Sequence, residues 1–178
     1  MLLTYNQYFQ QIHEAKQVGL LYHLVSVRKL NYILKNNTLS PSNYQYISFT
    51  RNKNMWSYAG DDNPTYQIVL DGDKLSHNYK TEPFSYPELR EMGFNEQEER
   101  VLGEIKNIKK YIVQINKISW KNIAKNNEFQ CGGAFILNYV ENNGKNNSHD
   151  NKRATEFIDS LIKMDDMITS KGIKLNKL

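Results

Sequence analysis

Strand-like segments occur along this chain without the regular alternation with helices that a parallel sheet requires. Each segment is short, and each either alternates apolar with polar residues or is continuously apolar, as half-buried and fully buried strands are. The segments lie at residues 20–23, 46–50, 66–70 and 111–118. Because they do not recur as β-α-β units, we predict an α+β fold rather than a doubly wound sheet.

Three helices are predicted from apolar residues that recur at three- and four-residue spacing. They span approximately residues 5–15, 26–35 and 152–170. Ser26 is the expected N-cap of the second helix, and Asn36 and Asn37 mark its end because asparagine tolerates the left-handed backbone conformation. No linker and no repeat divides the chain, so we predict a single domain over residues 1–178.

The composition limits the compartments and partners that suit this chain. Its 178 residues carry a net charge of +4 and one cysteine, Cys131. A lone cysteine excludes an internal disulfide and a zinc knuckle, and it fits a reducing, cytoplasmic location. The start of the chain lacks the pattern of a signal peptide, and no apolar run approaches the ~20 residues that span a membrane. We therefore expect a cytoplasmic protein with no membrane partner. Its positive charge permits a nucleic-acid partner without requiring one.

Polar side chains with useful chemistry occur in three separate segments. Tyr22 and His23 end the first predicted strand, directly before a helix, and Glu98 and Glu99 precede an apolar Val-Leu pair. The second strand and the loop after it add Ser48, Thr50, Arg51, Trp56 and Tyr58, with the first three expected on the polar face of the strand. Ordinary interpretations stay open: a structural histidine that satisfies the next helix, a solvated strand end, core aromatics and a charged first turn of a helix.

The order of these motifs resembles that of the ADP-ribosyltransferase superfamily, over roughly residues 19–118. The segment LYHLVSVRKLNYILKNNTLSP is similar to the YH strand and the following helix of that family, with Asn37 at the usual glycine. ISFTR stands in the place of the second strand, which bears Ser or Thr, and QEERVL looks like the glutamate segment of the DarT-type toxins that modify nucleic acids. The resemblance implies a small split β-sheet core with flanking helices.

The same resemblance implies a mono-ADP-ribosyltransferase that uses NAD and no metal, as a phage or toxin effector with a nucleic-acid or protein acceptor. It assigns catalysis to Glu99, or to Glu98 if the register differs by one residue. The residues that it assigns to NAD are Tyr22, His23, Ser48, Thr50, Arg51, Trp56 and Tyr58. We expect His23, Glu99 and Ser48 or Thr50 to line one cleft.

The chemistry of NAD agrees with these residue types. Breaking the bond between nicotinamide and ribose develops positive charge on the sugar, which a fixed carboxylate stabilises. An arginine can bind phosphate oxygens with two hydrogen bonds, and aromatic rings can enclose nicotinamide. Two alternatives remain: an NAD-dependent RNA 2′-phosphotransferase, and a non-catalytic binder such as a phage-encoded inhibitor or virion component.

The segment VLDGDKL lacks the further ligands of a calcium loop, and we expect a β-turn there.

Overall fold

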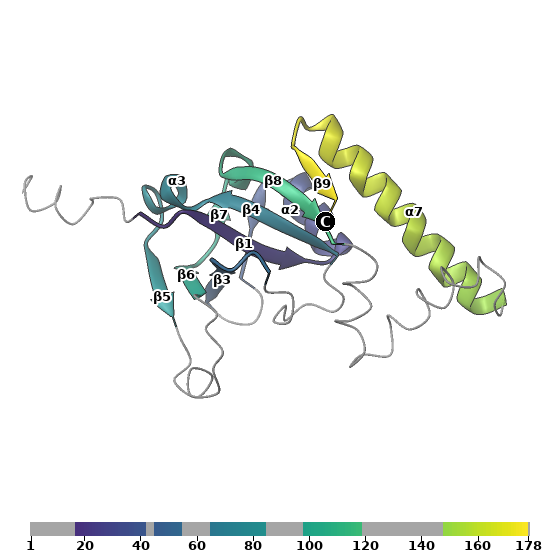
Figure 1. Cartoon of the computed structure of the whole chain (residues 1–178), viewed down its shortest axis with the longest axis horizontal. Helices are drawn as coiled ribbons and strands as arrows, with labels where there is room; N and C mark the ends of the chain where they lie inside the picture. The colour runs from purple at the N-terminus through teal and green to yellow at the C-terminus, as the bar shows by residue number, and fades with distance from the viewer. Residues whose placement is uncertain (1–16, 42–44, 55–64, 85–97, 119–147, 178) are drawn as a thin grey trace, which may run out of the picture.

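A computed structural model describes residues 17–41, 45–54, 65–84, 98–118 and 148–177 (Figure 1). Within these ranges, seven strands form one mixed sheet in the order β5-β6-β3-β1-β4-β8-β9. Neighbouring strands in it are antiparallel except β8 and β9. The strands are β1 (Leu20–Val25), β3 (Tyr46–Thr50), β4 (Tyr66–Asp71), β5 (Thr81–Phe84), β6 (Glu98–Leu102), β8 (Ile112–Lys117) and β9 (Leu175–Lys177).

Two short strands and three α-helices complete the fold in the described ranges. β2 (Thr38–Leu39) pairs with β7 (Ile105–Lys106) as a second sheet. The helices are α2 (Val27–Asn36), α3 (Gly72–Ser76) and α7 (Ser148–Ser170), and a 3-10 turn follows β7 at Ile108–Lys110. This arrangement confirms the predicted α+β class.

Both longer helices pack on one face of the large sheet, which we call the core face. Residues directly opposite each other in antiparallel strands share a face, so the register places Leu21, Val25, Ile68 and Ile115 together. These side chains form one hydrophobic core with Leu30, Ile33 and Leu34 of α2 and Leu161, Met164 and Ile168 of α7. The described segments therefore share a single core.

The two ends of α2 are fixed by the residues predicted for them. Ser26 Oγ accepts a hydrogen bond from the backbone N–H of Lys29 at 3.3 Å. Asn37 adopts the left-handed conformation with φ 56°, and its side-chain oxygen accepts from the backbone N–H of Lys109 at 3.0 Å. The end of α2 is thereby tied to the chain just after β7.

Asp71, Gly72 and Asp73 open α3 and do not form the predicted β-turn. Asp71 Oδ1 accepts from the backbone N–H of Lys74 at 2.9 Å, which makes Asp71 the N-cap. The Asp73 carboxylate accepts from the backbone N–H groups of Gly19 and Val18, and these bonds hold the pKa of Asp73 below its usual value. The Asp73 carboxylate, which the sequence places in a turn, thus connects α3 to the segment before β1.

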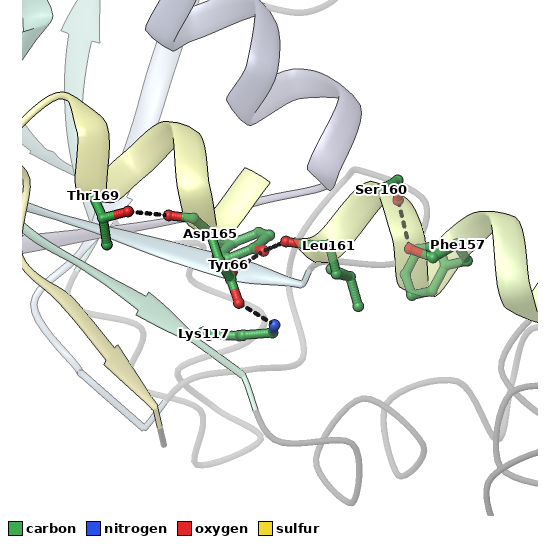
Figure 2. Close-up of polar contacts among 7 residues, drawn as sticks. All are labelled: Tyr66, Lys117, Phe157, Ser160, Leu161, Asp165 and Thr169. Atoms are coloured by element: carbon green, nitrogen blue, oxygen red, sulfur yellow. Dashed lines mark hydrogen bonds and ion pairs between the residues drawn. The ribbon is translucent and has the colours of Figure 1, made fainter. Parts of the chain in front are cut away.

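Figure 2 shows how Asp165 anchors α7 to the sheet. The Tyr66 hydroxyl of β4 donates to Asp165 Oδ1 at 2.7 Å, and Lys117 Nζ of β8 lies 2.6 Å from Asp165 Oδ2. Tyr66 is fully buried, and this burial, together with the nearby carboxylate, raises its pKa above the usual value. The hydroxyl therefore keeps its proton and remains a donor.

Several sequence predictions need correction or lie outside the described ranges. The first strand continues to Val25, so His23 lies inside β1 and not at its end. The apolar spacing of the last predicted helix puts Ile162 on its buried side, but Ile162 is 54% exposed. The predicted helix at 5–15 and the side chains of Trp56, Tyr58 and Cys131 fall outside the residues that the structure describes. None of the helices in the described ranges combines the length and apolar character needed to cross a membrane.

Candidate functional site

His23 lies where β1 and β3 separate. Tyr22 and Thr50 are the one pair that joins these strands in the described ranges, whereas β1 pairs with β4 along its whole length. Beyond that pair, His23 Nδ1 forms a hydrogen bond with the backbone carbonyl of Ser48 at 2.9 Å. Because a carbonyl oxygen only accepts, Nδ1 donates this hydrogen bond. The histidine thus holds two strands together where their backbone pairing stops. The N-cap of the next helix, α2, is Ser26.

Glu99 shares the core face with His23. Glu99 is opposite Phe49 in the ladder between β3 and β6, and the Tyr22–Thr50 pair places His23 next to Phe49 on the other side. The rings of His23 and Phe49 have centroids 5.4 Å apart. His23 and Glu99 therefore lie on either side of Phe49, on the strands that flank β3.

Arg51 pairs with Glu99 from the end of β3. Its Nη2 lies 2.5 Å from Glu99 Oε1. The glutamate side chain is 2% exposed and the arginine side chain 33% exposed, so the anion lies inside and the cation at the rim. A buried carboxylate is costly without a partner, and Arg51 supplies one while its guanidinium keeps contact with water.

Glu98 lies on the opposite face of the sheet. It is paired with Thr50 in the ladder, and its Oε1 lies 2.9 Å from the Nε of Arg100 on the same strand. Adjacent residues of a strand point to opposite faces, so Glu98 and Glu99 cannot both reach the same ligand. The two glutamates that the sequence left as alternatives are therefore separated by the sheet itself.

Tyr22, Ser48 and Thr50 also lie on this opposite face, because Tyr22 pairs with Thr50 and Ser48 pairs with Arg100. The expectation that the side chain of Ser48 or Thr50 lines one cleft with His23 and Glu99 does not hold in this register. Ser48 contributes to the histidine through its backbone carbonyl alone in the contacts described here.

One residue of this site was misplaced from the sequence, and another was not selected. Arg51 was expected on the polar face of its strand, but it follows Phe49 by two residues and shares the face of Phe49. Phe49 itself, which lies between His23 and Glu99, was not among the predicted site residues. The two-residue periodicity of a strand contains both signals: positions 49 and 51 share one face, and positions 48 and 50 share the other.

The cluster of His23, Arg51 and Glu99 combines an imidazole ring, a guanidinium at the rim and an enclosed carboxylate. Such a set can bind an anionic group through Arg51 and place a negative charge beside a cationic centre. In the described ranges, no three His, Cys, Asp or Glu side chains are grouped so that they could hold a metal ion. The arrangement thus suits a ligand that carries both phosphate and a centre that becomes positively charged.

Comparison with known proteins adds no relative to this picture. No protein-family model matches the sequence, and no curated protein is significantly similar to it. A function is therefore proposed from the fold and from the cluster of His23, Arg51 and Glu99.

Proposed function

We propose that the protein is a NAD-dependent mono-ADP-ribosyltransferase with the split-sheet core of that superfamily. The observation that carries the proposal is the convergence of His23, Arg51 and Glu99 from three strands onto one face, next to the point where β1 and β3 separate. The resemblance of the YH segment and of QEERVL to the motifs of the family supports the same residues from sequence.

In the proposed reaction, the bond between the nicotinamide nitrogen and C1′ of ribose breaks, and nicotinamide leaves with the bonding electrons. C1′ then forms a bond with a nucleophilic atom of the acceptor, and the proton of that nucleophile passes to Glu99 or to water. The sugar carries positive charge in between, and the Glu99 carboxylate stabilises that charge. His23 hydrogen-bonds a ribose hydroxyl.

The ion pair between Arg51 and Glu99 must open for this reaction. Arg51 is a third exposed, and its guanidinium can form two parallel hydrogen bonds with phosphate oxygens. We propose that the pyrophosphate of NAD draws Arg51 away from Glu99, which leaves the carboxylate facing the ribose. Binding of the cofactor and exposure of the catalytic charge are then one event.

The acceptor is a nucleic acid in our preferred form of the proposal, because the net charge of +4 suits a polyanion. A protein acceptor is the alternative. A different class, a non-catalytic binder on a degenerate transferase fold, is favoured by one observation: Glu99 is buried and already neutralised by Arg51, as in a purely structural ion pair.

The test uses nicotinamide release from NAD, with single-stranded DNA, single-stranded RNA or protein as the acceptor. Glu99→Gln should lower the rate by ~10²-fold or more, because it removes a charge that acts in the transition state. Glu98→Gln is the matched control, one residue away on the opposite face, and should keep the wild-type rate. Loss of turnover in the Glu98 variant alone would move the catalytic assignment. If the wild type neither binds NAD nor releases nicotinamide from it, the result would support the alternative, a non-catalytic binding protein on a degenerate transferase fold.

A further inference from the structure

A groove of about 790 Å³ lies between α2 and α7. One wall runs along α2 from Ser26 to Lys35, and the other along α7 from Phe157 to Met167. At a rise of 1.5 Å per residue, each wall is roughly 15 Å long. The groove therefore has two helical walls of about three turns each, which is the shape that a third helix fills by packing its side chains between them.

The groove has an apolar floor at its α7 side. Phe157, Met164 and Met167 follow one another at three- to seven-residue spacing on a single stripe of that helix, and Val27 faces them from α2. Met164 is buried, whereas the other three are partly exposed. Methionine side chains adapt to different apolar partners, so this stripe suits the apolar face of an incoming helix.

Within the described ranges, the charged residues that line the groove are all cations: Arg28 and Lys35 on α2 and Lys163 on α7. All three are exposed, and none forms an ion pair with a residue in the described ranges. No carboxylate is among the lining residues that belong to the described part of the chain. The rim of the groove is therefore positively charged around an apolar floor.

We propose that this groove binds an acidic amphipathic helix of a partner protein. The apolar stripe of such a helix would cover the partly exposed Phe157 and Met167, and its flanking carboxylates would reach Arg28, Lys35 and Lys163. A nucleic-acid strand would satisfy the three cations, but it would leave the apolar floor against a sugar-phosphate backbone. Shape, apolar surface and charge together select the peptide.

The groove is separate from the cluster proposed for NAD. It shares no residue with His23, Arg51 and Glu99. It also lies away from the polar contacts of Asp165 with the sheet: Figure 2 shows Ser160, a lining residue, and Lys117, which pairs with Asp165, on opposite sides of the α7 axis. A ligand can thus occupy the groove without breaking the hydrogen bond and the ion pair of Asp165.

The test is a fluorescence anisotropy titration of the full chain with a labelled 14-residue peptide, capped at both ends, that has leucine at helical spacing and glutamate elsewhere. A peptide of the same composition in scrambled order keeps the charge and removes the apolar stripe. Lys163→Glu and Arg28→Glu each reverse one charge of the rim. Lys171→Glu, an exposed cation just beyond the end of α7, is the matched control.

We expect the amphipathic peptide to bind and the scrambled peptide to bind at least about ten-fold more weakly. Lys163→Glu and Arg28→Glu should each weaken binding by about five-fold or more, and Lys171→Glu by less than about two-fold. Equal effects of Lys163→Glu and Lys171→Glu, or equal binding of the scrambled peptide, would overturn the proposal.

Other occupants of the groove would give different results, and each would also overturn it. Binding of a single-stranded DNA 14-mer that depends on Lys163 and Arg28, without such dependence for the peptide, would assign the groove to nucleic acid. A dimer of the chain that dissociates on Lys163→Glu would assign it to a second copy. Nicotinamide release by Lys163→Glu should equal that of the wild type, so this proposal and the proposed function can fail separately.

Discussion

Replacing Arg51 by methionine removes the charge that faces the buried Glu99 and keeps most of the side-chain volume. Breaking a fully buried ion pair by removing one partner costs about 3–5 kcal/mol, because the remaining charge has no compensation. Arg51 is 33% exposed, so water already solvates part of the pair and can approach the glutamate when the guanidinium is gone. We therefore expect Arg51→Met to lower the free energy of unfolding by about 1–3 kcal/mol.

Replacing the other partner, Glu99, by glutamine should lower the free energy of unfolding by less, because the two partners are buried to different extents. In Glu99→Gln the amide oxygen can still accept a hydrogen bond from Arg51, and the arginine that loses its anion is at the rim, where water solvates it. We expect this variant to lose about 0–1 kcal/mol. The double variant should then lose at least about 1 kcal/mol less than the sum of the two single variants.

Urea unfolding of the wild type, the two single variants and the double variant measures this cycle. Each kcal/mol lost from the free energy of unfolding should lower the melting temperature by roughly 2–4 °C for a chain of this size. Lys80→Met is the control: Lys80 pairs with Glu82 at 2.6 Å, but both side chains are largely exposed, and its urea midpoint should not change. An Arg51 variant as stable as the Lys80 variant, or additive single effects, would show that Glu99 does not depend on Arg51.

Two further substitutions test the contacts that shape the fold. In Gly72→Ala the new Cβ would lie 2.4 Å from the carbonyl oxygen of Gly19 and 2.9 Å from Leu21 Cγ. Thermal unfolding should therefore show that the free energy of unfolding falls by about 1–3 kcal/mol. An unchanged melting temperature would contradict the close approach of α3 to the start of β1. Tyr66→Phe removes the donor to Asp165 and should cost about 1–2 kcal/mol. Because the folded-state pKa of Tyr66 is raised above 10.0, the wild type should lose stability as the pH rises above that value, where the unfolded tyrosine ionises. The phenylalanine variant should lack that part of the alkaline decline.

The sequence predicted the elements whose signals are local. Two-residue alternation in YISFT gave the correct faces of Ile47, Ser48 and Phe49 in β3, and Ser26 and Asn37 marked the bounds of α2. β6 was not predicted, because Glu98 and Glu99 favour a helix over a strand on propensity alone. Its strand conformation comes from pairing with β3 on one side and β5 on the other, which is tertiary information.

The shortest strands and the longest-range pairings could not be predicted for a related reason. β2 and β7 have two residues each, too few for a periodicity, and they pair across more than sixty positions, as Leu39 does with Ile105. β9 lies beside β8 because α7 returns the chain to the sheet edge, and nothing in the three residues of β9 indicates a parallel partner.

The candidate site was predicted by residue type, and its geometry required the register of the sheet. His23 and Glu99 were selected by motif, and the structure places both on the core face. The choice between Glu98 and Glu99 could not be made without knowing which of them is opposite Phe49. The ion pair with Arg51 follows from the same register, since the Phe49–Glu99 pair brings position 51 beside the glutamate.

The strength of that ion pair also limits how the proposed enzyme can work. The contacts of NAD, with Arg51 and with other residues, must together supply at least the free energy that the arginine gains from Glu99. Charge-assisted hydrogen bonds contribute about 1.5–3 kcal/mol each, so a guanidinium that binds pyrophosphate through two of them can repay a coupling of 1–3 kcal/mol. A coupling well above that range exceeds what these two hydrogen bonds supply, and it would favour a structural role for the pair. The mutant cycle therefore decides more than the stability of one contact, because its value separates a carboxylate that a cofactor can uncover from one that the fold keeps neutralised.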